Sequence, residues 1–189
     1  MKITTALLGL MLVLSVSLPV QAQMAEQITL YADKFGTDCS ISDTGEGTVI
    51  VYIFHVGTGT RIGCEFRVPK PECWAGATWV GDNFGSFGVI GQSQGPDVSV
   101  AYGACLPLPI YVGKMVFEVT GSAEPCCRYP VLPSVYVPWS VITVDCTSDA
   151  NTIPILGGSA VINENASCSC EPPLAAESTT WGRVKSLYH

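Results

Sequence analysis

Ser93 lies in the segment GQSQG, which has the G-x-S-x-G pattern of a nucleophilic serine in hydrolases. That pattern requires a strand before the serine, a helix after it, and an acid and a histidine later in the chain. Here Pro96 and the alternating segment DVSVAY follow, which predicts a strand, and the only later histidine is His189. The sequence therefore favours a glycine-rich hairpin loop at Ser93, and a hydrolase remains only the second alternative function.

His55 and three acids are the next candidates for chemistry. His55 ends the apolar segment TVIVYIFHV, where a lone histidine is expected to be hydrogen-bonded within the core or at its edge. Asp33, Asp38 and Asp43 cluster in the first long loop, and carboxylates are the ligands that calcium prefers. Their spacing matches no D-x-[DN]-x-[DN]-G loop, so the competing interpretation is that they bond their own turns. Calcium at these acids is the one cofactor hypothesis.

Four aromatic side chains lie close together in a glycine-rich stretch, namely Trp74, Trp79, Phe84 and Phe87. Exposed rings on a sheet can stack on sugars or on a protein partner. A carbohydrate-binding module that uses Trp74 and Trp79 is therefore the first alternative function. The competing interpretation is that these rings cover the core beneath a long loop.

The cysteines predict disulfides, because the chain carries an export signal, described below. Cys64 and Cys73 enclose a proline-containing turn that could bring them together, and Cys146 could reach Cys126 or Cys127 from a neighbouring strand. A zinc site would need reduced thiolates and a spacing such as C-x-x-C, which does not occur. All nine cysteines are candidates, and the sequence does not say which one is unpaired: Cys39, Cys64, Cys73, Cys105, Cys126, Cys127, Cys146, Cys168 and Cys170.

Residues 1–22 have the pattern of a secretory signal peptide, with Lys2, an apolar stretch and small residues before a predicted cut after Ala22. The apolar stretch is shorter than the roughly 20 residues of a membrane span, so no span is expected after cleavage. The protein is therefore expected to be extracellular, periplasmic or attached to the cell surface. Losing Lys2 changes the net charge from -7 to -8, which argues against a nucleic-acid partner.

Residues 23–170 predict an all-β fold. Short segments of β-branched and aromatic residues alternate with polar residues between turn clusters, which favours an antiparallel β-sandwich of about nine strands, cross-linked by disulfides. The segment 48–56 is nearly all apolar, which predicts a central strand that is buried on both faces or nearly so. The expected strands are 28–32, 48–56, 61–68, 77–81, 97–102, 110–119, 134–137, 141–146 and 159–163.

The C-terminal residues differ from this body. Residues 171–178 are rich in proline and polar side chains, which predicts a linker. Residues 179–189 predict a short amphipathic helix, which would be marginal alone and must dock on its own domain or on a partner. Its apolar positions, spaced three and four apart, are Trp181, Val184, Leu187 and Tyr188.

The tail TTWGRVKSLYH resembles the W-G-x-[IV]-K-x-[LM]-[YF] ends of a group of uncharacterised secreted bacterial proteins, and segments such as VYIFHV, VITVDC and ASCSC resemble the same group. This resemblance implies export, with the tail as a sorting or docking signal, and no activity. The order of segments is also similar to cohesin-type sandwiches, in CEFRV, KMVFEVTG and GGSAVIN. The cysteine content departs from cohesins, so dockerin binding is not implied.

These observations predict a secreted module that is not an enzyme and that acts in adhesion, structure or binding at the cell surface or outside the cell. No complete set of catalytic residues stands in the sequence. The partner is expected to be a protein or a carbohydrate. The oligomeric state does not follow from the sequence.

Overall fold

The computed structural model describes residues 25–121 and 123–170. The signal peptide, linker and tail helix predicted above lie outside the described residues. The described residues contain no α-helix, and so none that could span a membrane. They form the strands β1 (Gln27–Tyr31), β2 (Ser40–Ile41), β3 (Glu46–Val56), β4 (Thr60–Phe66), β5 (Ala77–Asn83), β6 (Gly88–Gly91), β7 (Val98–Pro107), β8 (Ile110–Thr120), β9 (Cys127–Pro130), β10 (Val141–Val144), β11 (Thr152–Gly157) and β12 (Ser159–Ile162).

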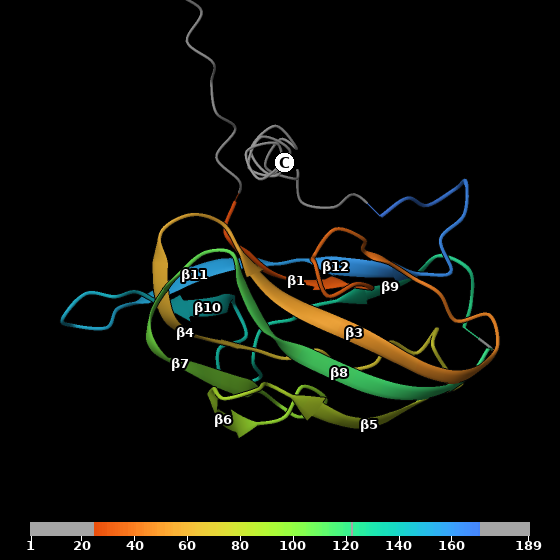
Figure 1. Cartoon of the computed structure of the whole chain (residues 1–189), viewed down its shortest axis with the longest axis horizontal. Coiled ribbons are helices and arrows are strands. Elements are labelled where there is room, and N and C mark those ends of the chain that lie inside the picture. The colour runs from red at the N-terminus through yellow and green to blue at the C-terminus, as the bar shows by residue number, and fades with distance from the viewer. Residues whose placement is uncertain (1–24, 122, 171–189) are drawn as a thin grey trace, which may run out of the picture.

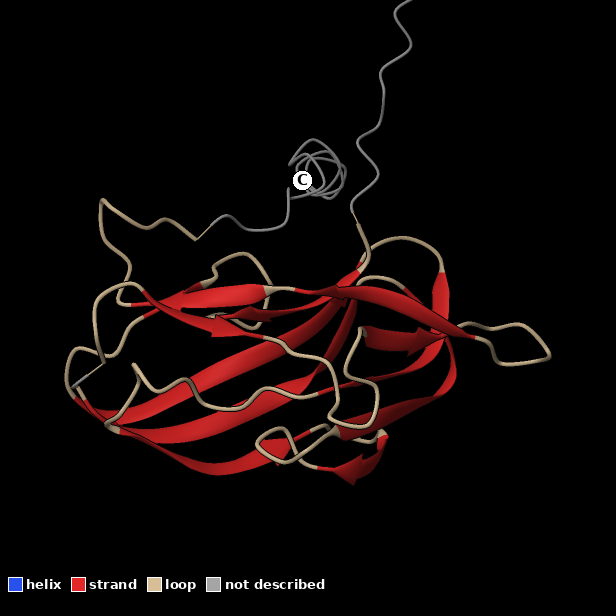
Figure 2. Ribbon diagram, turned by 180° about the vertical axis from the view of Figure 1, so that it is seen from behind, coloured by secondary structure: helices blue, strands red, loops and turns tan. Residues whose placement is uncertain are grey.

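Nine strands form one sheet in the order β5-β8-β3-β1-β11-β10-β4-β7-β6, and β2, β12 and β9 form a smaller sheet. The large sheet curls on itself, so that its two halves pack face to face as a sandwich (Figures 1 and 2). Most neighbouring strands are antiparallel, whereas β1 with β11 and β2 with β12 are parallel. The predicted fold class, an all-β sandwich cross-linked by disulfides, is confirmed.

The core lies between the two halves of the large sheet and follows from the alternation of side chains along each strand. Val51 of β3 stands opposite Met115 of β8, and both are fully buried. Trp74, in the loop before β5, packs on Phe117 and Tyr129 with ring centroids 4.6 and 5.7 Å apart. Large buried rings therefore fill the centre, which is the main stabilising contribution of such a core.

Some expected strands are corrected by the structure. The segment 134–137 is a loop, because Val137 N donates to Ser134 O as in a turn and the prolines on either side fix the backbone. The strands β2, β6, β9 and β11 were not predicted. They are short, and β6 and β11 stand in glycine-rich or turn-like sequence, where the alternation of apolar residues is weak.

Four cysteine pairs lie at disulfide distance, with Cα atoms 5.6 to 5.8 Å apart: Cys39 with Cys170, Cys73 with Cys127, Cys105 with Cys146, and Cys126 with Cys168. The predicted pairing of Cys64 with Cys73 is wrong, since Cys64 points into the core as a free thiol. The pairing of Cys146 with Cys126 or Cys127 is also wrong. Sequence spacing failed here because every pair joins residues more than 40 positions apart.

Candidate functional site

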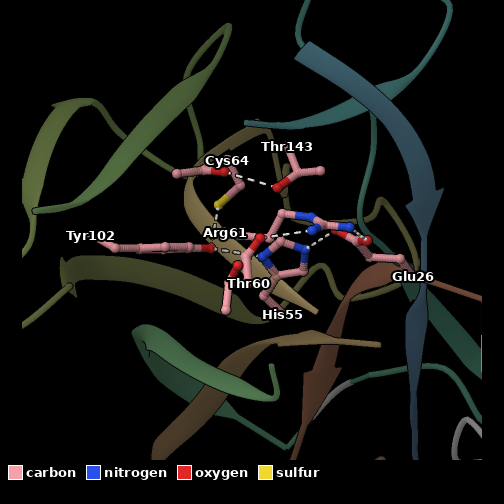
Figure 3. Close-up of polar contacts among 8 residues, drawn as sticks. Glu26, His55, Thr60, Arg61, Cys64, Tyr102 and Thr143 are labelled. Carbon is pink, nitrogen blue, oxygen red and sulfur yellow. Dashed lines mark hydrogen bonds and ion pairs between the residues drawn. The ribbon is translucent and has the colours of Figure 1, made fainter. Parts of the chain in front are cut away.

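A buried polar network joins both halves of the sandwich around His55 (Figure 3). His55 lies on β3, and its Nε2 is 2.9 Å from Oε1 of Glu26, which directly precedes β1. Its Nδ1 is 2.9 Å from the hydroxyl of Tyr102 on β7. Arg61 on β4 forms an ion pair with Glu26, and the Tyr102 hydroxyl lies 3.1 Å from Sγ of Cys64 on β4. Five side chains, from the residue before β1 and from β3, β4 and β7, therefore meet in one place.

The protonation state of the network follows from its burial. Burial lowers the pKa of His55, and Arg61 adds to this, against the opposing hydrogen bond and charge of Glu26. We therefore assign a neutral His55 whose Nε2–H donates to the Glu26 carboxylate, which can only accept. Nδ1 then accepts from the Tyr102 hydroxyl, whose oxygen also lies 3.1 Å from Sγ of Cys64. Burial also raises the pKa of Cys64 to about 12, which keeps it a thiol.

This network connects strands, and its reactive groups are enclosed by the fold. His55 is fully buried and both of its nitrogens are hydrogen-bonded to side chains of the network, so no substrate reaches them in this structure. Cys64 is buried and protonated, whereas a nucleophilic cysteine needs an accessible thiolate. The prediction of a histidine satisfied within the core is confirmed. Sequence reasoning missed Glu26, Arg61 and Tyr102 as its partners, because nothing in their spacing links them.

Ser93 lies in the loop that joins β6 to the antiparallel β7, as the hairpin interpretation predicted. Its side chain is fully buried. Its hydroxyl donates to Oδ1 of Asp82 at 2.7 Å, and its backbone N–H donates to Oδ2 of the same carboxylate at 2.7 Å. The serine therefore attaches the loop to β5, and no histidine stands beside it among its hydrogen-bond partners.

The three acids of the calcium hypothesis do not converge. Asp33 accepts hydrogen bonds from the backbone of Phe35, Thr37 and Asp38, and these lower its pKa although partial burial acts to raise it. Asp38 accepts from its neighbour Ser40. Asp43 is buried and accepts from Nε1 of Trp74 at 2.7 Å. Among the described residues, no group of three or more acidic, histidine or cysteine side chains is placed to hold a metal ion.

The four aromatic candidates belong to the core or its margin. Trp74 has no exposed surface and Phe84 is only 9% exposed, while Trp79 and Phe87 are half-buried. Nε1 of Trp79 donates to Asp82, and Phe87 packs on Tyr102 with centroids 5.1 Å apart. Since Trp74 is enclosed, it cannot stack on a sugar.

A different set of side chains forms an apolar surface, on the outer face of β3 and β8. Ile50, Tyr52 and Phe54 alternate along β3 with the buried Val51 and Ile53, so they point away from the core. On β8 they are opposed by Val116, Lys114 and Tyr111 respectively. We call Ile50, Tyr52, Phe54, Tyr111 and Val116 the aromatic face.

The rings of the aromatic face contact one another. Phe54 lies 5.4 Å and Tyr52 lies 6.3 Å from Tyr111, measured between ring centroids, and Tyr111 remains 43% exposed. The prediction that 48–56 is buried on both faces or nearly so holds for the inner face, whereas the outer face is only half-buried. A sheet face in contact with water normally carries polar side chains at these positions. The continuous apolar sequence of β3 was the signal for this surface.

One polar cleft of about 410 Å³ lies where β1, β9 and β12 meet the end of the described chain, and Thr29, Arg128, Ser159 and Cys170 are among its lining residues. A second cleft of about 370 Å³ lies beside β11. Neither contains the histidine, the thiol or Ser93. The tail positions Trp181, Val184, Leu187 and Tyr188 lie outside the described residues.

No family model matches the sequence, and no curated protein matches it. Solved structures with a similar arrangement of strands are cohesins. The sixth cohesin of scaffoldin B from Acetivibrio cellulolyticus, in complex with a Cel5 dockerin, has a TM-score of 0.49 at 12% identity and covers 75% of this chain and 99% of its own. A cohesin–dockerin complex from Clostridium thermocellum has a TM-score of 0.46 at 14% identity, covering 73% of this chain and 99% of its own.

A type I cohesin from Pseudobacteroides cellulosolvens has a TM-score of 0.43 at 13% identity, and covers 78% of this chain and 97% of its own. With identities and TM-scores this low, the binding surfaces of those cohesins cannot be transferred to this chain. The fold of this chain is established by its own strand pairing.

Proposed function

We propose that this chain is an exported binding module without enzymatic activity, and that it binds a protein partner through the aromatic face. The observation that carries the proposal is the outward row of Ile50, Tyr52 and Phe54 on β3, opposed by Tyr111 and Val116 on β8. These side chains add little to the core, because they point away from it. Tyr111 is 43% exposed and the four others are half-buried, Phe54 partly by the ring of Tyr31, so a partner would bury these side chains further.

A protein partner suits the chemistry of this surface. Tyrosines are enriched at the centres of protein interfaces, where a large ring is buried and its hydroxyl keeps a hydrogen-bond partner. On the same outward side of β8, Lys114 lies within the face, opposite Tyr52, and Glu118 lies beyond Val116 at its edge. Dockerin is not proposed as the partner, since no feature of this surface identifies one.

A role without catalysis is supported by the reactive side chains, which are buried and hydrogen-bonded to other residues of the fold. Ser93 is buried against Asp82, both nitrogens of His55 are bonded, and Cys64 is a buried thiol. Trp74 has no exposed surface, so it cannot serve as the sugar-stacking ring of a carbohydrate-binding module that uses Trp74 and Trp79. An esterase or peptidase activity that disappears in Ser93→Ala would contradict the proposal.

Export is supported by the signal-peptide pattern and by four cysteine pairs at disulfide distance, which are typical of oxidising compartments. We further propose that residues 179–189 are a sorting or docking signal on the 171–178 linker. Deleting residues 178–189 should then change the location of the protein in cell fractions while leaving its melting temperature nearly unchanged. A large fall in melting temperature would show instead that the tail is part of the fold.

The aromatic face is tested by a photo-crosslinking amino acid at position 111 in the secreted protein, returned to the envelope and culture fluid of its own cells. The matched control carries the same group at Ile90, which is 77% exposed on β6, outside the aromatic face. A discrete protein adduct from position 111 alone is expected. Adding Tyr52→Ala to that protein should reduce the yield about tenfold, as loss of one interface hot spot would. Equal adducts from both positions, or none from 111, would contradict the proposal.

A further inference from the structure

The loop 131–140, between β9 and β10, is held rigidly by three other parts of the chain. Leu132 and Arg67 exchange two backbone hydrogen bonds of 2.9 Å, and Nε of Arg67 donates to Pro133 O at 2.8 Å. Val135 N donates to Pro96 O at 3.0 Å, in the loop after β6. These bonds connect the loop to the end of β4 and to the β6–β7 hairpin.

The far end of the loop lies against β11, since the hydroxyl of Ser140 is 2.8 Å from Val141 O and 3.0 Å from Ile155 O and can donate to either. Pro133 and Pro138 restrict the backbone further. The conformation of the loop is therefore largely determined before any ligand arrives, and this lowers the entropic cost of binding.

This well-held loop nevertheless directs its large side chains into water. Trp139 is 77% exposed, Tyr136 is 69% exposed and Val135 is 48% exposed. At the attached end, Ser140 and the 57% exposed Leu156 line the cleft of about 370 Å³ beside β11. A loop that only closed the fold would gain nothing from two exposed rings. Their position is explained if they contact a ligand.

The size and charge of this surface decide among ligand classes. The loop offers three exposed apolar side chains on one ten-residue segment, a smaller apolar surface than the aromatic face. A sugar ring, by contrast, is held by one or two aromatic rings that stack on its C–H face. The loop 131–140 contains no charged residue. The acid that lines the adjoining cleft, Glu26, is already bonded to Arg61 and His55.

We propose that Tyr136 and Trp139 form a binding platform for a neutral polysaccharide, separate from the aromatic face. The rings would stack on pyranose faces, and the indole N–H and phenol O–H at their edges would donate to ring hydroxyls. Acidic polysaccharides and anionic lipid surfaces are disfavoured, because the whole chain carries a net charge of -7 and the one cation bonded to the loop, Arg67, donates its Nε to Pro133 O.

The test is affinity electrophoresis of the folded, disulfide-intact protein in native gels that contain hydroxyethyl cellulose, xylan, galactomannan or soluble starch, with polygalacturonate as the anionic comparison. At least one neutral polymer should retard the protein and polygalacturonate should not. Trp139→Ala should weaken the retarding affinity by about tenfold or more, and Trp139→Phe by less, because a smaller ring remains for stacking.

Phe35→Ala is the matched control, since Phe35 is an equally exposed ring, at 73%, on a different loop. It should leave the retardation unchanged, as should Tyr111→Asp, so that failure of this platform and failure of the aromatic face are distinguishable. Trp139 is exposed, so its replacement should leave the melting temperature unchanged. Absence of retardation in all neutral polymers, or retardation that survives Trp139→Ala, would overturn the proposal. The proposal would also be overturned if Trp139→Ala lost binding to a protein or to lipid vesicles but kept its binding to polysaccharide.

Discussion

At the scale of single residues, the hydroxyl of Tyr102 is the group on which the buried network depends. It lies within hydrogen-bond distance of both Nδ1 of His55 and Sγ of Cys64, 2.9 and 3.1 Å away. Burial raises the pKa of Tyr102, and the nearby Cys64 and Glu26 raise it further. The hydroxyl therefore keeps its hydrogen. With Glu26 and Arg61 the network connects β1, β3, β4 and β7.

Tyr102→Phe removes this hydroxyl and leaves Nδ1 of a fully buried His55 without a donor. We expect a loss of about 1–3 kcal/mol in the free energy of unfolding, the usual cost of a buried group left unsatisfied. Urea denaturation followed by tryptophan fluorescence measures it. Tyr111→Phe, on the exposed aromatic face, serves as the control and should change stability by less than about 0.5 kcal/mol. Equal stability of both variants would show that the network contributes nothing.

The same network predicts a dependence of stability on pH. The pKa of His55 is lower in the folded protein than its usual 6.5, so the unfolded chain binds a proton more readily. The stabilisation by neutral His55 is therefore complete above about pH 6.5 and is lost as pH falls below it, with a slope of up to about 1.4 kcal/mol per pH unit. Unfolding free energies between pH 8 and pH 5.5 test this.

His55→Gln should flatten that slope, whatever it does to stability at pH 8. The control is His189→Ala, which removes the second histidine of the chain and should leave the slope of unfolding free energy against pH unchanged. If the unfolding free energy of the natural protein rises as pH falls from 8 to 5.5, the assigned neutral state is wrong.

At the scale of elements, the alternation of apolar residues predicted the strands that form the core, and failed where another force decides the structure. The ends of β3, β8 and β10 follow their sequence closely. The segment 134–137 has strand-like residues, yet Arg67, Pro96 and the turn at Ser134 hold it as a loop. The short β12 is a strand because β2 and β9 pair with it on either side, as the sequence also predicted from its apolar run.

The candidate sites were less predictable than the fold. Exposure depends on which face of a strand meets the core, and the sequence of 48–56 is apolar on both faces. The spacing of the cysteines does not predict their pairing either. Cys126 pairs with Cys168, later in the chain, whereas the adjacent Cys127 pairs with Cys73, earlier in the chain. Glu26 and Tyr102 meet at His55 only because the large sheet curls.

The disulfides allow one matched prediction at this scale. Cys126–Cys168 and Cys105–Cys146 close loops of nearly equal length, with sequence separations of 42 and 41. Replacing both cysteines of either pair by serine should therefore cost a similar amount, roughly 2–4 kcal/mol. Only the loss of Cys126–Cys168 should expose residues 164–168 to limited proteolysis, since this bond holds that stretch beside β9 while Cys39–Cys170 holds the residues after it. Cleavage of both variants at the same sites would contradict the assigned pairing.

At the scale of the whole molecule, the described part of the chain is a cross-linked sandwich with its reactive groups buried and with two apolar surfaces, the aromatic face and the loop 131–140, in contact with water. We propose a protein as the partner of the aromatic face on β3 and β8, and a neutral polysaccharide as the ligand of the loop 131–140. A molecule with both contacts would hold a protein partner close to a glycan outside the cell.

The most direct test of the aromatic face is hydroxyl-radical footprinting, read by mass spectrometry, of the protein in its native cell-surface or secreted fraction and after purification. We predict that Tyr52, Phe54 and Tyr111 are modified severalfold more slowly in the native fraction than in the purified protein, while Ile90 on β6 is modified equally in both. Equal modification of the three rings in the two samples would contradict the assignment of this face as the binding surface.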